Sequence, residues 1–291
     1  MAGNQPTILI QLDTDPQPSV FDSVVAVDSG VEQLFRHGGI TPENVTGLVH
    51  GALFTRGPAD LHRSAIFIGG SNVAASEAIF EAVKSTFFGP FRVSVLFDAN
   101  GSNTTAAAAV LSASKGMGGS LDGISAAVLG ATGPVGERVA RLLGRRGVKV
   151  AVGSRDQSRA EKLAEKLRSA TGGDFRPFGT SNPADLPQTL DGVSLIVSAG
   201  AAGACLLPRS IRENLPDLKV MIDLNAVPPL GIEGIEATDK DKLHGSVRAW
   251  GALGVGGLKM KIHRKAIQAL FESNDKILDA EQVLELGQSL T

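Results

Sequence analysis

Gly130-Ala-Thr-Gly-Pro-Val-Gly136 is the stretch that decides the fold of this chain. It directly follows the apolar run at residues 124–129 and opens a segment whose apolar residues recur at helical spacing, namely Val135, Val139, Leu142 and Leu143. A strand, a glycine-rich turn and a helix in this order form a phosphate-binding site, because glycines let the backbone approach phosphate oxygens and the helix N-terminus offers unpaired N–H groups. The stretch therefore predicts a Rossmann-type, doubly wound parallel sheet with a dinucleotide site.

The residues after the next strand favour NADP over NAD. The apolar run at residues 148–152 ends in Gly153-Ser154-Arg155. An NAD site normally has an acidic residue at this strand end for the ribose 2′-hydroxyl, whereas a serine followed by an arginine suits a 2′-phosphate. The alternative is a glycine-rich turn in a nucleotide-free domain, with Arg155 merely solvated.

Small residues after two further strands complete the predicted cofactor site. The run at residues 193–198 leads into Ala199 and Gly200, and the run at residues 220–224 leads into Asn225. Ligands of parallel sheets collect beyond the carboxyl ends of strands. The predicted cofactor contacts are Gly130, Thr132, Gly133, Pro134, Val135, Gly136, Ser154, Arg155, Ala199, Gly200 and Asn225.

Composition excludes several classes of protein. The chain has 291 residues, enough for two domains, and a net charge of -2 with scattered basic residues, so a nucleic-acid partner is not expected. One cysteine gives neither a disulfide framework nor a metal-ligand pattern. No apolar run is long enough to span a membrane and no signal-peptide pattern is present, so we expect a soluble cytoplasmic protein. Without tyrosine, the Tyr-x-x-x-Lys chemistry of short-chain dehydrogenases cannot operate.

The first hundred residues predict an α/β unit of their own. We expect strands at residues 7–12, 44–54, 64–68 and 91–97, and helices at residues 19–27 and from about residue 71 to residue 86. Asp22 lies in the first turn of the first helix, where compensation of the helix dipole would by itself explain an acid.

A polar cluster, Asp98-Ala-Asn-Gly-Ser-Asn-Thr-Thr105, follows the strand at residues 91–97. Its position beyond a strand end predicts a substrate loop, with donors and acceptors from Asn100, Ser102, Asn103, Thr104 and Thr105. The alternative is an Asx turn with a helix N-cap, because Asn, Ser and Thr favour those positions intrinsically. Composition does not distinguish the two.

The C-terminal part predicts two helices. Leu258, Ile262, Ala266 and Leu270 form one apolar face, and Asp279-Ala-Glu-Gln282 is a capping pattern for the last helix. A similar pattern, Ser158-Arg-Ala-Glu161, is expected to start a helix in the nucleotide domain. Lys259 stands at a helix start, where the dipole disfavours a cation, so another reason for a lysine is expected there.

Six segments together resemble the bacterial NAD(P)-dependent methylene-tetrahydromethanopterin dehydrogenases, and in particular their NADP-dependent branch. They are Ser19-Val-Phe-Asp22, residues 87–94, residues 98–107, Gly130–Gly136, Pro228-Pro-Leu-Gly-Ile232 and Gly254-Val-Gly-Gly-Leu-Lys259. The resemblance covers nearly the whole chain. It implies a pterin domain at residues 1–115 and 260–291, an NADP-binding Rossmann domain at residues 116–259, and homo-oligomers, either trimers or hexamers.

The resemblance also implies residue roles. The acid and the lysine that the family places near the pterin correspond to Asp22 and Lys259, and its substrate loop corresponds to residues 100–105. The implied reaction moves a hydride from a methylene carbon to the nicotinamide, with tetrahydromethanopterin or tetrahydrofolate as the carrier of that carbon.

Two other functions remain open at this stage. A shikimate-type dehydrogenase also has a substrate domain before an NADP domain, but it needs a catalytic lysine in the N-terminal half, and the only lysine before Ser94 is Lys84. A non-enzymatic NADP-sensing protein would keep Gly130–Gly136 and Arg155 but lose the substrate loop.

Overall fold

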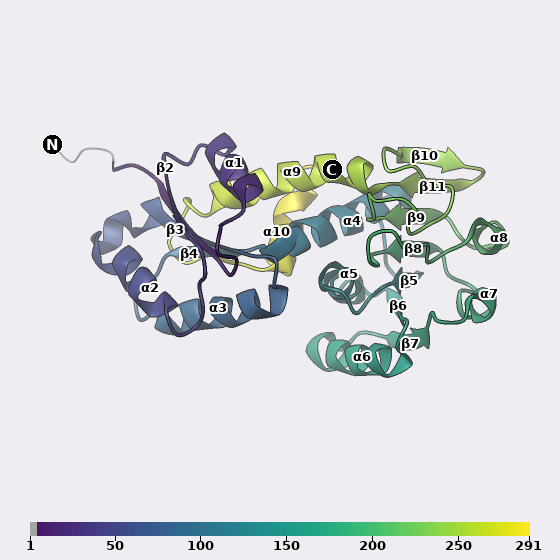
Figure 1. Cartoon of the computed structure of the whole chain (residues 1–291). Helices are drawn as coiled ribbons and strands as arrows, with labels where there is room; N and C mark the ends of the chain where they lie inside the picture. Colours follow the sequence, from purple (N-terminus) through teal and green to yellow (C-terminus); the bar gives the residue numbers. More distant parts are fainter. Residues whose placement is uncertain (1–4) are drawn as a thin grey trace. The chain divides into compact units, whose positions relative to one another are not determined.

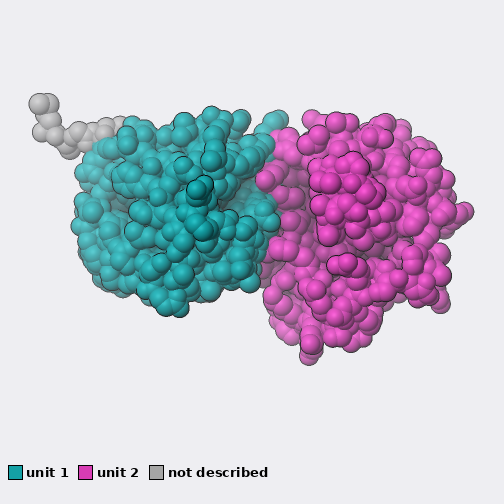
Figure 2. Space-filling model, viewed as in Figure 1, with its two compact units in different colours: residues 1–104, 260–290 teal, residues 105–259, 291 magenta. Residues whose placement is uncertain are grey.

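The computed structural model describes residues 5–291, which fall into two compact α/β units (Figures 1 and 2). Unit 1 consists of residues 1–104 and 260–290, and unit 2 of residues 105–259 with residue 291. The division within helix α4 (Ser102–Gly116) lies before the expected domain boundary at residues 115/116. The reason is packing: a Cβ placed on Gly116 would lie 2.8 Å from Val220 and 2.9 Å from Trp250, so the end of α4 belongs to unit 2.

Unit 1 contains a five-stranded parallel sheet in the order β12-β4-β3-β1-β2. Figure 1 shows α2 and α3 on one face of this sheet and α1 on the other. The core between sheet and helices includes Leu12, Val49, Ile68, Ile79 and Phe97. The elements are β1 (Ile8–Asp13), α1 (Val20–Asp28), β2 (Gln33–His37), α2 (Val45–Phe54), β3 (Ser64–Gly69), α3 (Val73–Thr86), β4 (Ser94–Phe97), the first part of α4, the end of α9 (Ala252–Ala269), β12 (Ile277–Leu278) and α10 (Ala280–Gln288).

Unit 2 contains a seven-stranded sheet in the order β10-β11-β9-β8-β5-β6-β7, in which only the β10–β11 pair is antiparallel. Figure 1 shows α5 and α6 on one side of it and α7 and α8 on the other. The predicted doubly wound fold is confirmed. The elements are β5 (Ser125–Leu129), α5 (Pro134–Gly144), β6 (Lys149–Ser154), α6 (Gln157–Thr171), β7 (Phe175–Gly179), α7 (Leu186–Thr189), β8 (Leu195–Ser198), α8 (Arg209–Arg212), β9 (Val220–Asp223), β10 (Lys240–His244) and β11 (Val247–Trp250).

The strand predicted at residues 44–54 is wrong, since this segment is helix α2. Its buried residues are Val45, Val49, Ala52 and Leu53, which is helical spacing that the β-branched composition concealed. The sequence also missed strand β2, which is mostly exposed at the edge of the sheet and therefore lacks an apolar pattern.

Helix capping differs from expectation in one place and agrees in another. Helix α6 is capped by Asp156, whose carboxylate accepts from the N–H groups of Ser158 and Arg159, so the helix begins before the predicted cap at Ser158. The predicted capping box of the last helix is confirmed, with Asp279 and Gln282 bonded reciprocally.

Candidate functional site

The turn after β5 brings two strand ends into contact. Gly130 has a φ of +72°, and a Cβ there would lie 2.6 Å from the Cα of Gly200, which follows β8. Gly136 serves a different purpose, since its Cβ would lie 2.6 Å from the carbonyl oxygen of Gly130. The first glycine therefore permits the strand ends to approach, and the last permits α5 to pack closely on the turn.

A cavity of about 640 Å³ opens at these strand ends within unit 2. Eight of the predicted cofactor residues line it: Gly130, Thr132, Gly133, Pro134, Ser154, Arg155, Ala199 and Gly200. Six further residues line it that are not among the predicted cofactor contacts: Asp156, Arg159, Thr180, Ala201, Ala204 and Leu206. Its location, at the carboxyl ends of β5, β6 and β8, is where a doubly wound sheet binds a dinucleotide.

One end of this cavity carries two guanidinium groups. Arg155 and Arg159 are exposed, and neither forms an ion pair within residues 5–291. Ser154, at the end of β6, places its hydroxyl 3.3 Å from that of Thr132. Asp156 also lies here, but its carboxylate is hydrogen-bonded to the first turn of α6. This end therefore offers hydroxyls and cations, the groups that bind a phosphate.

Arg159 could have been found from the sequence. It lies four residues after Arg155, in the first turn of a helix that the sequence predicted at nearly the right place. Arg155 lies in the short turn between β6 and α6, so a cation in the first turn of α6 was foreseeable as a second group at the same strand end.

Three predicted cofactor residues do not line the cavity. Val135 and Gly136 belong to the first turn of α5, where Gly136 is buried. Asn225 is also buried, and its side chain bonds within its own loop, accepting from the N–H of Val227 at 2.9 Å and donating to the carbonyl of Pro229 at 3.3 Å. These contacts shape the loop after β9.

Unit 1 has a second group of polar side chains beyond its strand ends. Asp22 is buried in the first turn of α1, and Asp13 is buried at the end of β1. A Cβ on Gly69, the last residue of β3, would lie 3.2 Å from Asp13 Oδ2 and 3.7 Å from Asp22 Oδ2. Strands β1 and β3 are neighbours whose connections lead to opposite sides of the sheet, so Asp22 lies at the topological switch point of unit 1.

Asp13 was not predicted, and its role is to fix the loop that precedes α1. Its carboxylate accepts from the backbone N–H groups of Asp15 at 2.9 Å and Ser19 at 3.1 Å. Ser19 in turn caps α1, because its hydroxyl accepts from the N–H of Asp22. Asp22 is thus held by the same network that starts the helix.

The polar cluster after β4 divides into two groups. Ser102, Asn103 and Thr104 are fully buried, and the Asp98 carboxylate accepts from the N–H groups of Asn103 and Thr104 and, at 2.6 Å, from the Thr104 hydroxyl. These bonds are those of the turn-and-cap alternative. Asn100 is exposed with a φ of +52°, and Thr105 is half-buried.

Lys259 is half-buried in α9, in the part of this helix that belongs to unit 2, whereas Asp22 belongs to unit 1. Of the predicted apolar face, Ile262, Ala266 and Leu270 are fully buried, and Leu258 is half-buried. The end of α9 is anchored in unit 1 by stacking of His263 on Phe67, with ring centroids 5.7 Å apart. The pairing of Lys259 with Asp22 stays a prediction.

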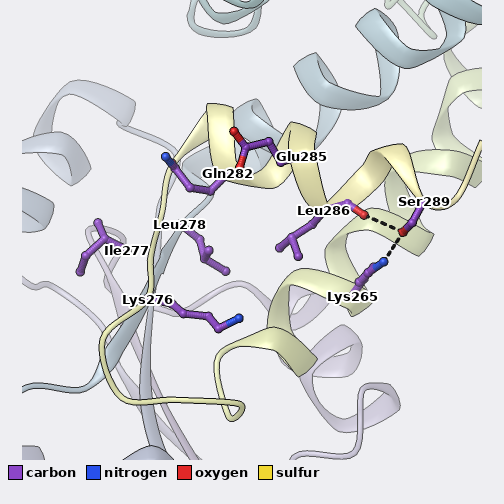
Figure 3. Close-up of a pocket in the computed structure, with 8 residues that line it drawn as sticks. All are labelled: Lys265, Lys276, Ile277, Leu278, Gln282, Glu285, Leu286 and Ser289. Atoms are coloured by element: carbon purple, nitrogen blue, oxygen red, sulfur yellow. Dashed lines mark hydrogen bonds between the residues drawn. The ribbon is translucent and has the colours of Figure 1, made fainter. Parts of the chain in front are cut away.

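Another hollow, of about 430 Å³, lies between α9, β12 and α10 in unit 1 (Figure 3). Lys265 from α9 donates to the Ser289 hydroxyl across it, and Lys276 is paired with Glu272 at 2.5 Å. None of the predicted site residues lines this hollow.

Residues 5–291 contain no cluster of His, Cys, Asp and Glu side chains that could hold a metal ion. No helix in this part of the chain has the length and apolar character needed to cross a membrane.

Solved structures with the same fold are distant in sequence. The chain aligns over 99% of its length with all of the 5-ketofructose reductase of Gluconobacter sp., at 14% identity and a TM-score of 0.54. It aligns over 98% of its length with all of the quinate dehydrogenase of Corynebacterium glutamicum in complex with NAD, at 16% identity and a TM-score of 0.50. At such identities the likeness shows the two-domain α/β fold alone.

Sequence relatives are much closer. Residues 20–100 match the family model described as "Methylene-tetrahydromethanopterin dehydrogenase, N-terminal". The chain is 45% identical to the Bifunctional protein MdtA of Methylorubrum extorquens, over 97% of this chain and 98% of the relative. It is 31% identical to the NAD(P)-dependent methylenetetrahydromethanopterin dehydrogenase of the same organism, over 92% of this chain and 93% of the relative. The chain therefore belongs to the methylene-tetrahydromethanopterin dehydrogenase family.

Proposed function

We propose that this protein is an oxidoreductase that transfers a hydride from methylene-tetrahydromethanopterin to NADP, giving the methenyl pterin and NADPH. One observation carries the proposal. This chain belongs to the dehydrogenase family, and Ser154, Arg155 and Arg159 line the cavity at the strand ends of its unit 2. Methylene-tetrahydrofolate is a second substrate to be compared with the first.

The reaction asks for positioning rather than for proton transfer. A bound NADP would supply the hydride acceptor, its nicotinamide ring, and loss of the hydride would leave the methylene carbon as a cation stabilised by its two neighbouring nitrogens. No acid or base is required, in agreement with a chain that lacks tyrosine. The protein must hold two flat rings face to face and exclude water, a task that can lower the barrier by up to about 7–11 kcal/mol.

In unit 2, Arg155 and Arg159 bind the 2′-phosphate of NADP, and Ser154 and Thr132 contribute hydroxyls beside it. Charge-assisted hydrogen bonds from guanidinium groups are about twice as strong as neutral ones, so the two arginines determine the choice between NADP and NAD. The glycine turn receives the pyrophosphate at the N-terminus of α5.

In unit 1, the pterin binds beyond the ends of β1, β3 and β4, where Asp22, Asn100 and Thr105 lie. Ser102, Asn103 and Thr104 act indirectly, by fixing the loop that presents Asn100. Lys259 orients the pterin together with Asp22. A cation beside a developing cation is unfavourable, so Lys259 places the substrate and does not stabilise the charge.

The shikimate-type alternative is weaker. Its N-terminal catalytic lysine would have to be Lys84, which is paired with Glu81 at 2.7 Å in the same helix and lies 4.5 Å from the centroid of the Phe80 ring. The fold shared with quinate dehydrogenase does not carry its activity to this chain, because one fold hosts many reactions.

A direct assay tests the proposal. Purified protein is incubated with methylene-tetrahydromethanopterin and NADP, and with methylene-tetrahydrofolate, shikimate and NAD in parallel. We expect the absorbance of NADPH and of the methenyl product to grow together with the pterin substrates. Turnover of shikimate without turnover of either pterin would reverse the assignment, and NADP binding without any turnover would favour an NADP-sensing protein.

The remaining family expectations belong to the same proposal. Unit 1 is the pterin domain and unit 2 the NADP domain, and the protein is a cytoplasmic homo-oligomer, either a trimer or a hexamer. Light scattering coupled to size-exclusion chromatography measures the oligomeric mass directly.

A further inference from the structure

Asp223, the last residue of β9, is a buried carboxylate that bonds both ends of one loop. It has no exposed surface. Oδ1 accepts from the N–H of Asn225 at 3.1 Å, and Oδ2 accepts from the N–H of Ile232 at 2.8 Å. The loop of residues 225–231 is thereby closed on a single side chain.

A carboxylate is energetically unfavourable at this buried position. Burial raises the pKa of Asp223, against the opposing effect of its hydrogen bonds from Ile232 and Asn225. Within residues 5–291 no lysine, arginine or histidine is paired with it. An unpaired buried charge is unfavourable, and an apolar residue would fill the space at less cost. What a carboxylate offers, and an asparagine does not, is an acceptor oxygen on each side.

The closed loop holds a wall of the dinucleotide cavity. The carbonyl of Gly231 accepts from the N–H groups of Leu206 at 2.8 Å and Leu207 at 3.0 Å. Leu206 lines the cavity, and its side chain lies 2.4 Å from where a Cβ on Gly200 would be. The Ser198 carbonyl accepts from the N–H of Leu224 at 2.9 Å, which ties the end of β8 to the end of β9.

Space around the carboxylate is fully used. A Cβ on Gly231 would lie 2.0 Å from the Ser198 hydroxyl and 2.8 Å from Asp223 Oδ1. The loop therefore packs directly on Asp223, and a methyl group on Gly231 would displace the loop from the carboxylate.

We propose that Asp223 is a positioning residue that fixes the segment of residues 199–206, and through it the half of the cavity that receives the nicotinamide. The inference rests on the proposed function for the identity of the ligand. In a doubly wound sheet the two mononucleotide halves bind on opposite sides of the first strand. Arg155 and Arg159 are on the β6 side, so the β8–β9 side is left for the nicotinamide.

The test compares two ligands that share the adenosine half. Isothermal titration calorimetry measures binding of NADP and of 2′,5′-ADP, which lacks the nicotinamide, to the parent, Asp223→Asn and Gly231→Ala. Losing one charged acceptor of a backbone N–H should weaken NADP binding by about tenfold. Binding of 2′,5′-ADP should stay within about twofold, because its contacts lie on the β6 side. Gly231→Ala retains the carboxylate and should give the same selective loss if Asp223→Asn does not fold.

Asp239→Asn is the matched control. Asp239 is also buried in unit 2 and accepts from a backbone N–H, that of Glu236, but it does not line the cavity. This variant should bind both ligands like the parent. Equal binding of NADP by the parent and both test variants would overturn the proposal, and so would a parallel loss of both ligands, since that would indicate damage to the whole unit.

A second readout needs no nucleotide. Cys205, the single cysteine, is exposed and adjacent to Leu206, so its reaction rate with a disulfide reagent reports on the segment. We expect a several-fold faster reaction in Gly231→Ala, which leaves the charge near Cys205 unchanged. An unchanged rate would contradict the positioning role. If the parent bound neither ligand, the proposed cofactor would be wrong. The reaction rate of Cys205 would still test whether Asp223 positions residues 199–206.

Discussion

At the scale of single residues, we expect the cofactor preference to depend on Arg155 and Arg159, two arginines outside the glycine turn. We expect Arg155→Ala to raise the KM for NADP by one to two orders of magnitude, about the value of a charge-assisted phosphate contact, and Arg159→Ala to act in the same direction. The KM for NAD, which has no 2′-phosphate, serves as the internal control and should change little. Steady-state kinetics with both cofactors measure this. Unchanged NADP kinetics in both variants would refute the phosphate site.

Asp239 should make stability depend on acid. Burial alone would raise the pKa of Asp239, but hydrogen bonds from Lys242 at 2.8 Å, from the N–H of Glu236 at 3.0 Å and from His244 at 2.7 Å hold it below its ordinary value. Because the folded state favours the ionised form, its stabilisation is complete above the ordinary pKa and is lost as the pH falls through the lowered one.

The melting temperature of the parent should therefore fall more steeply than that of Asp239→Asn between about pH 5 and pH 3. Differential scanning fluorimetry across this range measures both slopes. Parallel curves would show that Asp239 does not contribute to the acid transition.

At the scale of elements, the segment at the start of α4 is expected to contain two kinds of residue, buried ones that stabilise the fold and an exposed one that contacts the substrate. The buried Thr104 hydroxyl bonds Asp98, so Thr104→Val should destabilise the fold by about 1–2 kcal/mol, the cost of a lost cap bond, without changing the pterin KM. The exposed Asn100 should behave oppositely. Asn100→Gly tolerates the positive φ, so stability should be retained while the pterin KM rises. Urea denaturation and steady-state kinetics on both variants measure the contrast. A raised pterin KM in Thr104→Val with normal stability would favour the original prediction that Ser102, Asn103 and Thr104 contact the substrate.

At the scale of the whole molecule, the two residues proposed to act on the pterin belong to different units, Asp22 to unit 1 and Lys259 to unit 2. If Lys259 positions the pterin, Lys259→Ala should depress turnover on the order of a hundredfold, the cost of about 1 Å of misplacement, with NADP affinity near normal. Asp22→Ala should reproduce part of this defect. The double variant should be less impaired than the product of the two single effects, as expected for residues that act as one unit. Full turnover in Lys259→Ala would contradict the pairing of Lys259 with Asp22. So would a double variant in which the two single effects on turnover multiply independently.

The sequence by itself determined the nucleotide fold and most of its cavity. Glycine spacing, a buried apolar run and a helical face are local patterns, and they located β5, its turn, α5 and the Ser154-Arg155 strand end, with eight of eleven predicted contacts lining the cavity.

Only the tertiary structure decided what depends on distant partners. Residues 45–54 are a helix because their buried positions pack against a sheet that composition does not reveal. Asn103 and Thr104 are buried in the first turn of α4 because the Asp98 carboxylate accepts from their N–H groups, and Asp223 closes its loop because the fold brings the N–H groups of Asn225 and Ile232 to its carboxylate. Local periodicity fixes which face of an element is apolar, whereas the use of a polar side chain depends on which backbone groups the fold brings within hydrogen-bonding distance.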